Sequence, residues 1–233
     1  MDTRLHGWDM LAIIAAITAT CLPFLLSGNA LSLNDDWLQL ASRHALLRQS
    51  LFQDFQFPLR TPFFMGGYPS IADPEDPCLN PLALLTVCFG EVMGLKLIAF
   101  TMYLAAGLGM YYLTRRCLGF GRTGALFASL AFGLCGWMPA RHAGGNVNEM
   151  YFTLTPLILA LVLESKTQKG RIVLLALIQA VILTDGKLVW PSIALFIVLL
   201  CVLEGVRISR GEVSADGECL RNFAVSAALA LLL

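Results

Sequence analysis

Long apolar runs alternate with short polar segments along most of this chain. The first run, Leu11 to Leu26, is broken only by Thr18, Thr20 and Pro23, and no A-x-A site follows it, so we interpret it as an uncleaved first span. A membrane-spanning helix needs roughly 20 apolar residues, fewer where it is short or sheltered. The pattern predicts about seven spans, at Trp8–Leu26, Leu95–Thr114, Thr123–Pro139, Met150–Leu163, Ile172–Thr184, Leu188–Leu203 and Phe223–Leu233. The shorter run Leu82–Val92 predicts a re-entrant or interfacial helix, or the start of a longer span.

Composition agrees with this pattern. The chain is 57% hydrophobic and 14% charged, whereas a soluble domain is about a quarter charged. We therefore expect one all-α, polytopic membrane helix bundle over residues 1–233. The formal net charge is zero, which gives no indication of a nucleic acid partner. The seven cysteines form no CxxC pair, so neither a zinc site nor a redox pair is indicated.

Lysine and arginine predict the orientation, because short cytoplasmic loops carry an excess of them. The segments around Arg115–Arg122, Lys166–Arg171 and Arg207–Arg221 hold most of these residues and are expected inside, with the N-terminus. Residues 28–81 then form a long first outer loop, and 141–149 and 185–187 are also outside. A loop of about fifty residues is too long for a simple connector, and such loops are more often functional.

The first outer loop opens with the acid pair Asp35 and Asp36. Adjacent carboxylates at the mouth of an apolar helix are costly to desolvate, which suggests a site at the membrane surface. From Trp37 to Phe55 apolar residues recur at helical spacing, which predicts an amphipathic helix. One of the two acids could cap the N-terminus of that helix, but capping does not account for both. The alternative is that both acids belong to a site. The aromatic, proline-rich stretch Phe57–Pro69, with Tyr68, either lies on the bundle or contacts lipid headgroups or a sugar.

Two further outer segments carry polar side chains. Arg141, His142, Asn146, Asn148 and Glu149 are packed between two spans. The histidine is either structural or, beside the arginine, part of a site for an anionic phosphate. The segment Thr184–Lys187 is either an ordinary turn with an ion pair or a third part of that site.

Several of these motifs together resemble the YfhO-like bacterial membrane proteins, which are related to the GT-C class of glycosyltransferases. The resemblance lies in Asn34–Trp37, Phe64–Pro69 with Ala72–Pro74, Asn80–Pro81, Gly136–Pro156 and Leu183–Lys187. It implies a bundle in the bacterial cytoplasmic (inner) membrane that takes a sugar from a polyprenyl-phosphate donor on the outer face. Such enzymes are usually longer, and this chain stops inside the apolar run Ala227–Leu233, so we expect a chain that is incomplete at its C-terminus.

The resemblance also implies roles for individual residues. Asp35 or Asp36 would be the general base on the acceptor hydroxyl, which is worth on the order of 10²–10⁴-fold in rate. Arg60, Arg141 and Lys187, with His142 in support, would face the donor phosphate. Tyr68, Asn146, Asn148 and Glu149 are candidate substrate contacts. A divalent metal, Mg or Mn, is an open alternative, because Asp35, Asp36 and Glu149 offer hard oxygen ligands.

Two other classes of function stay open. A transporter or flippase would place charges inside its spans, whereas here the polar residues gather on one face. A non-catalytic membrane subunit of a larger complex would explain a short chain with an apolar end, and it would bring a membrane protein partner.

Overall fold

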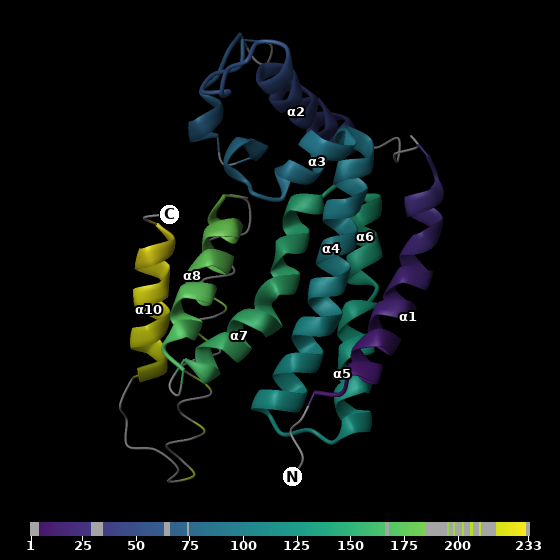
Figure 1. The fold of residues 1–233 in the computed structure, drawn as a ribbon, viewed down its shortest axis with the longest axis vertical. Helices are drawn as coiled ribbons and strands as arrows, with labels where there is room; N and C mark the ends of the chain where they lie inside the picture. The colour runs from purple at the N-terminus through teal and green to yellow at the C-terminus, as the bar shows by residue number, and fades with distance from the viewer. Residues whose placement is uncertain are drawn as a thin grey trace.

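The computed structural model describes residues 5–28, 35–62, 66–73, 75–165, 168–184 and 218–231, together with residues 195, 198, 202, 206 and 210. This part of the chain is built from helices and turns, and within it the sole β-type pairing is an isolated bridge between Thr61 and Tyr68. The prediction of an all-helical bundle is confirmed (Figure 1).

The bundle consists of helices that run roughly along its long axis (Figure 1). They are α1 (Gly7–Leu26), α4 (Glu91–Tyr112), α5 (Arg122–Gly133), α6 (Trp137–Ala143), α7 (Thr155–Glu164), α8 (Gly170–Leu183) and α10 (Glu218–Ala230). Helix α4 continues into one π-helical turn, η3 (Leu113–Cys117), and the 3₁₀ segment η4 (Val147–Leu154) leads into α7.

Four segments of the described chain are long and apolar enough to cross a membrane, namely Gly7–Leu26, Glu91–Cys117, Arg122–Ala143 and Val147–Glu164. They match the first four predicted spans. Helices α8 and α10, with 14 and 13 residues, lie at two more of the predicted positions but are shorter. The predicted span Leu188–Leu203 lies almost wholly outside the described residues. A membrane bundle is therefore supported, and the count of seven spans stays a prediction.

Helix α4 is the centre of the bundle and packs against α1, α3 (Ala83–Phe89), α5 and α7. Glycines on α4 let its neighbours approach closely. A Cβ atom at Gly94 would lie 2.3 Å from the Thr86 backbone of α3, and one at Gly107 would lie 2.6 Å from the Ile17 side chain of α1. Small residues at such crossings are typical of membrane helices, where packing replaces the hydrophobic effect as the driving force.

A buried cation joins α4 to the end of α1. The Nζ atom of Lys96, a residue that is 2% exposed, donates hydrogen bonds to Ser27 Oγ and to the Gly28 carbonyl, both at 2.7 Å. A positive charge at a helix C-terminus is favourable, because the last carbonyl groups there carry a partial negative charge. The contact fixes where α1 ends relative to α4.

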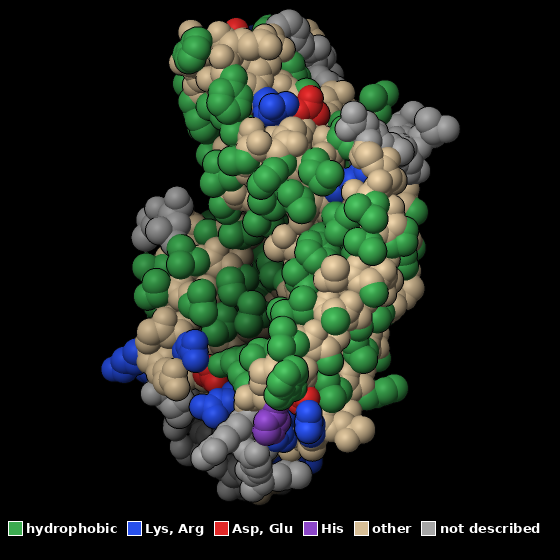
Figure 2. Space-filling view, turned by 45° about the vertical axis from the view of Figure 1, so that its right-hand side comes forward, with side chains coloured by type: hydrophobic (Ala, Val, Ile, Leu, Met, Phe, Trp, Pro, Cys, Tyr) green, Lys and Arg blue, Asp and Glu red, His purple; other side chains and the backbone are tan. Residues whose placement is uncertain are grey.

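The end of the bundle that carries the N-terminus holds two groups of ion pairs. Arg122 Nη2 lies 2.6 Å from the buried Asp9 carboxylate, to which Tyr111 also donates a hydrogen bond of 2.8 Å. Glu164 pairs with Arg171 at 3.0 Å and with Arg116 at 3.5 Å. The described parts of the segments around Arg115–Arg122 and Lys166–Arg171 therefore lie at the same end as the start of α1 (Figures 1 and 2).

The opposite end carries the long segment after α1 that was predicted to be the first outer loop (Figure 1). Helix α2 (Asp35–Phe52) is followed by the 3₁₀ turns η1 (Ser70–Ala72) and η2 (Pro77–Leu79), and α3 is a separate short helix that Gly90, at φ 89°, divides from α4. Of the predicted apolar face, Trp37, Leu40 and Leu47 are buried. Phe55 is 85% exposed, because the helix ends at Phe52 and the chain then turns through φ 51° at Phe55.

Two boundaries differ from the sequence-based expectation. Helix α2 begins at Asp35, so both acids lie in its first turn, and Asp35 does not precede the helix as a cap. Residues Arg141 and His142 occupy the last turn of α6, not a loop between spans. The helix runs on because Ala140 to Ala143 contains no breaker before Gly144 and Gly145.

The sidedness is open to a direct test. We expect a cysteine at position 55 to react with a membrane-impermeant maleimide added to intact cells, and one at position 168 to react only after the membrane is opened. Both positions are exposed, and the lysine and arginine pattern places them on opposite sides. The background should carry Cys88→Ser, because Cys88 is itself exposed. Labelling of position 168 in intact cells would contradict the predicted orientation and support the opposite one.

Candidate functional site

The start of α2 is fixed to the bundle by Trp37. This side chain is 2% exposed, and its indole Nε1 donates a 2.9 Å hydrogen bond to the carbonyl of His142 at the end of α6. The two rings meet edge to face, with centroids 5.3 Å apart. Two of the segments that were predicted to lie outside, 105 residues apart at Trp37 and His142, therefore meet here.

Gly145 allows that contact to be close. It has φ 78°, and a Cβ atom at this position would lie 2.6 Å from the Trp37 backbone nitrogen and 3.0 Å from the Asp36 carbonyl carbon. Any side chain would be excluded both by this space and by the left-handed backbone. The backbone at Asp36 and Trp37 is therefore held against the turn between α6 and η4.

A small polar cavity lies at this junction, which we call the Asp36 cavity. It has a volume of about 20 Å³, enough for one or two water molecules. Asp36 itself is exposed and forms part of the wall. The lining residues are Asp36, Gln39, Leu40, Arg43, Glu75, Gly145, Asn146 and Asn148. The structure thus brings together three of the predicted site residues: Asp36, Asn146 and Asn148.

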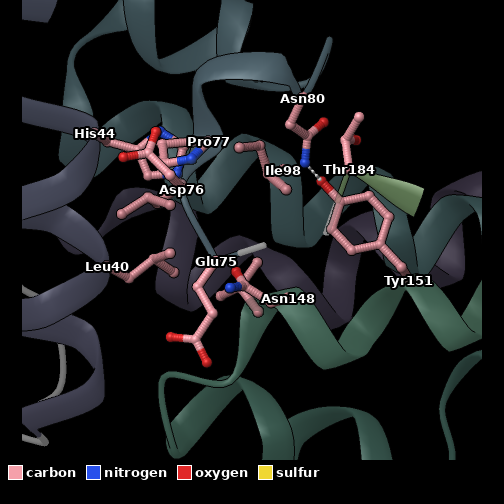
Figure 3. A pocket seen from close by; sticks show the side chains of 12 residues that line it. Leu40, His44, Glu75, Asp76, Pro77, Asn80, Ile98, Asn148, Tyr151 and Thr184 are labelled. Atoms are coloured by element: carbon pink, nitrogen blue, oxygen red, sulfur yellow. Dashed lines mark hydrogen bonds between the residues drawn. The ribbon is translucent and has the colours of Figure 1, made fainter. Parts of the chain in front are cut away.

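A second cavity of about 20 Å³ lies beside the first, and we call it the His44 cavity (Figure 3). The two share Leu40, Glu75 and Asn148 as common walls. Its other lining residues are His44, Asp76, Pro77, Asn80, Leu95, Ile98, Val147, Tyr151 and Thr184. In Figure 3, Asn80 and Tyr151 meet through a hydrogen bond on one side, and His44 lies beside Asp76 and Pro77 on the other. Thr184, from the third predicted outer segment, completes the wall.

Arg43 is a cation that the sequence analysis missed. It lies among the apolar residues of the predicted amphipathic helix, is 9% exposed and reaches the loop after η1. Its guanidinium lies 3.0 Å from Glu75 and 3.7 Å from Asp73. Periodicity gave no signal for this, because the partners come from a loop that folds back over the helix. Arg43 holds the Glu75 wall of both cavities in place.

Tyr68 acts within its own loop. Its backbone pairs with Thr61 through two hydrogen bonds of 3.0 Å, and its hydroxyl donates to Asp76 Oδ2 at 2.9 Å. Burial and the neighbouring Asp76 carboxylate raise the pKa of the Tyr68 hydroxyl. Asp76 also accepts from the backbone of Cys78 at 3.0 Å, so Tyr68 stabilises the wall at η2 without lining either cavity.

Arg141 and Glu149 pair with each other at 2.6 Å, and Arg141 also lies 5.6 Å from the Trp137 ring. Neither residue lines the Asp36 cavity or the His44 cavity. His142 packs on Phe24, with ring centroids 4.4 Å apart, and its Nδ1 atom is buried without a hydrogen-bond partner among the described residues. His142 therefore supports Trp37, while Arg141 and Glu149 engage each other at the same end of α6.

The remaining predicted residues lie apart from the cavities or outside the described chain. Arg60 is exposed on the Thr61–Tyr68 turn. Lys187 and the side chain of Asp35 lie outside the described residues. Across the described ranges, no three His, Cys, Asp or Glu side chains come together in a way that would hold a metal. The alternative of a Mg or Mn site therefore gains no support from this geometry.

His44 is the second residue that the sequence analysis missed. It is 4% exposed, and its Nδ1 lies 2.8 Å from Thr86 Oγ1 on α3. Burial lowers the pKa of His44 from 6.5 to about 4, although the nearby Glu91 carboxylate opposes the change. The imidazole is therefore neutral near pH 7. Helical spacing does carry a signal for its burial, because His44 lies four residues after Leu40 and three before Leu47, which are both buried; spacing gives no signal for its partner Thr86.

No family model, curated protein or solved structure matches this chain. The arrangement of the site must therefore be interpreted from its own geometry. The resemblance to the YfhO-like proteins stays a hypothesis that rests on the sequence motifs.

His44 predicts a specific dependence of stability on pH. Because its folded-state pKa is depressed, the unfolded chain gains a proton below about pH 6.5 that the folded chain takes up only near pH 4. Stability should be level above pH 6.5 and fall toward pH 4 by up to about 3 kcal/mol, since one pKa unit corresponds to about 1.4 kcal/mol. Unfolding midpoints in detergent at pH 7, 5.5 and 4 measure this fall. The His44→Asn variant should lose less over the same range, and an equal fall in both proteins would contradict the assignment.

Proposed function

We propose that this protein is a membrane glycosyltransferase-like protein that uses a polyprenyl-phosphate-linked sugar at the α2 end of its bundle. We place that end on the outer face of a bacterial inner membrane. The observation that carries the proposal is the exposed Asp36 side chain in the wall of a polar cavity, at the start of a helix that packs on the apolar helices α3 and α4. A lipid-linked substrate needs both surfaces, because its chain lies in the bilayer while its sugar lies in water.

Asp36 is the proposed general base. Its carboxylate would take the proton of the acceptor hydroxyl while that oxygen bonds to the anomeric carbon of the sugar. The bond from this carbon to the phosphate oxygen would break, and polyprenyl phosphate would leave with the electron pair. The amides of Asn146 and Asn148, in the same cavity wall, are suited to hold the hydroxyl for this transfer.

The size of the cavity constrains the arrangement. A space of about 20 Å³ admits a hydroxyl group but not a sugar ring. The bulk of the sugar and the phosphate would thus lie on the outer surface around Asp36, with only the reacting group between α2 and η4. This places the reaction at the edge of the bundle, where the lipid chain can stay in the bilayer.

The cation for the donor phosphate is a second part of the proposal. Arg141 is 40% exposed, so a phosphate can approach it, but Glu149 already neutralises it at 2.6 Å. Phosphate binding at Arg141 would therefore exchange one anion for another and would release Glu149. Arg60, His142 and Lys187 stay candidates on the resemblance alone.

One observation favours a second function, that of a non-catalytic membrane subunit. The exposed apolar side chains at and just after the end of α2 are Phe52, Phe55, Phe57 and Leu59, which are between 49% and 85% exposed. Contiguous exposed apolar side chains often mark protein contacts. A membrane protein partner seated on this segment would be expected under that alternative.

The catalytic role of Asp36 predicts a large effect from a small change. Asp36→Asn should lower sugar transfer by about a hundredfold or more, because the amide cannot accept the proton. Folding should be kept, since Asn retains the size and suits a helix start. The measurement is transfer of radiolabelled sugar from polyprenyl phosphate in membranes. Asp54→Asn is the matched control, because Asp54 is an exposed acid on the same outer segment that lines neither cavity.

Asp35→Asn belongs in the same experiment, since the resemblance does not separate the two acids. Whichever acid interacts mainly with the helix N-terminus should affect stability more than rate. Full transfer by the Asp35→Asn, Asp36→Asn double variant would remove the acid pair from the mechanism. That result would favour the function of a non-catalytic membrane subunit over that of a glycosyltransferase.

A further inference from the structure

The hydrogen bonds around His44 determine which of its ring nitrogens carries the proton. Thr86 Oγ1 donates to the carbonyl of Ala83 at 2.7 Å, which uses its one hydroxyl proton. The 2.8 Å contact between Thr86 Oγ1 and His44 Nδ1 therefore has Nδ1 as its donor. A neutral imidazole that is protonated at Nδ1 carries a lone pair at Nε2.

That lone pair belongs to a side chain that lines the His44 cavity (Figure 3). Among the described residues His44 makes one hydrogen bond, the one to Thr86. The side chain as a whole is 4% exposed, yet Nε2 is not among the fully buried polar atoms that lack a partner, so it keeps access to open space. An acceptor in so confined a place gains from a group that donates a hydrogen bond to it.

Most polar side chains around the His44 cavity already have hydrogen-bond partners within the protein. Asp76 accepts from Tyr68 and from the backbone of Cys78, and the Asn80 amide accepts from the backbone of Leu82 and donates to Tyr151. The Asn148 amide, in the wall shared with the Asp36 cavity, can donate. The space of about 20 Å³ fits one hydroxyl-bearing group or water.

We propose that the His44 cavity is a hydroxyl-binding subsite in which Nε2 of the neutral His44 ring accepts the hydroxyl proton in a hydrogen bond. The ligand class is an alcohol, and water fills the subsite when no alcohol is present. The identity of that alcohol as a second hydroxyl of the sugar substrate rests on the proposed function. The shared wall of Leu40, Glu75 and Asn148 places this subsite next to the Asp36 cavity. His44 lies eight residues after Asp36 on α2, about 12 Å along the helix axis, so a hydroxyl bound here belongs to a part of the substrate away from the reacting group.

A matched pair of variants separates the two nitrogens. His44→Asn places an amide where Nδ1 stood, so it keeps the hydrogen bond to Thr86 and removes the acceptor at Nε2. His44→Gln places an amide where Nε2 stood and loses the bond to Thr86. A purely structural histidine would be harmed more by the second change, and a hydroxyl-binding histidine more by the first.

The first measurement does not depend on activity. Nitrogen-15 spectra of histidine in the full chain, in lipid nanodiscs at pH 7, should show His44 neutral with its proton on Nδ1. The His44→Asn variant identifies the signal. Methanol, as the smallest alcohol probe, should shift the Nε2 signal saturably and leave that of Nδ1 nearly unchanged. A proton on Nε2, or an Nε2 signal that methanol does not move, would overturn the proposal.

The second measurement assigns the hydroxyl. In the transfer assay His44→Asn should raise KM for the sugar substrate by about 3- to 10-fold, the value of one neutral hydrogen bond, and leave kcat within about twofold. His44→Gln should keep KM closer to that of the unchanged protein. If no variant or parent transfers sugar, the proposed function fails, while the methanol result alone decides the subsite. A normal KM in His44→Asn would show that the substrate hydroxyl binds elsewhere.

Discussion

The site depends on one close contact, between the backbone at Trp37 and the glycine at position 145. The buried indole supplies the apolar contact and the hydrogen bond to His142, and Gly145 supplies the space. Without this contact nothing in the local sequence would hold an acidic helix start against the ends of two apolar helices. Both cavities lie along the same seam, so their shapes follow from how closely α2 approaches.

The helices on which α2 packs are themselves held together by close contacts. Glycines on α4 allow α1 and α3 to pack closely against it, and Lys96 hydrogen-bonds to the end of α1. At the far end, Asp9 and Glu164 hold the helix termini through arginines. The charges therefore gather at the two ends and leave the middle to small and apolar side chains, as a bilayer requires. This division is what makes a surface site more consistent with the chain than a transport path through it.

Sequence reasoning recovered the elements whose signal is local. The apolar runs predicted α1, α4, α5 and α7, and helical spacing predicted α2, since both depend on side chains within one helix. Arg43 and His44 were missed because their partners, Glu75 and Thr86, lie 32 and 42 residues further along the chain. Arg141 was expected to face a phosphate, but its partner is Glu149, a pairing that spacing alone does not distinguish. Phe55 was predicted to lie on the apolar face of the helix, but it is exposed because the helix ends at Phe52.

The most direct test of this account is amide hydrogen exchange in α2, measured on the protein in lipid nanodiscs with a single methyl group added at Gly145. Gly145→Ala should raise exchange along Asp35–Leu47, because its Cβ would lie 2.6 Å from the Trp37 nitrogen in a left-handed backbone conformation. Gly136→Ala is the control, since a Cβ there meets nothing within 4 Å and the residue has φ −60°. Faster exchange in the first variant alone is the predicted result. Equal protection of α2 in both variants would contradict the claim that this contact holds the site together.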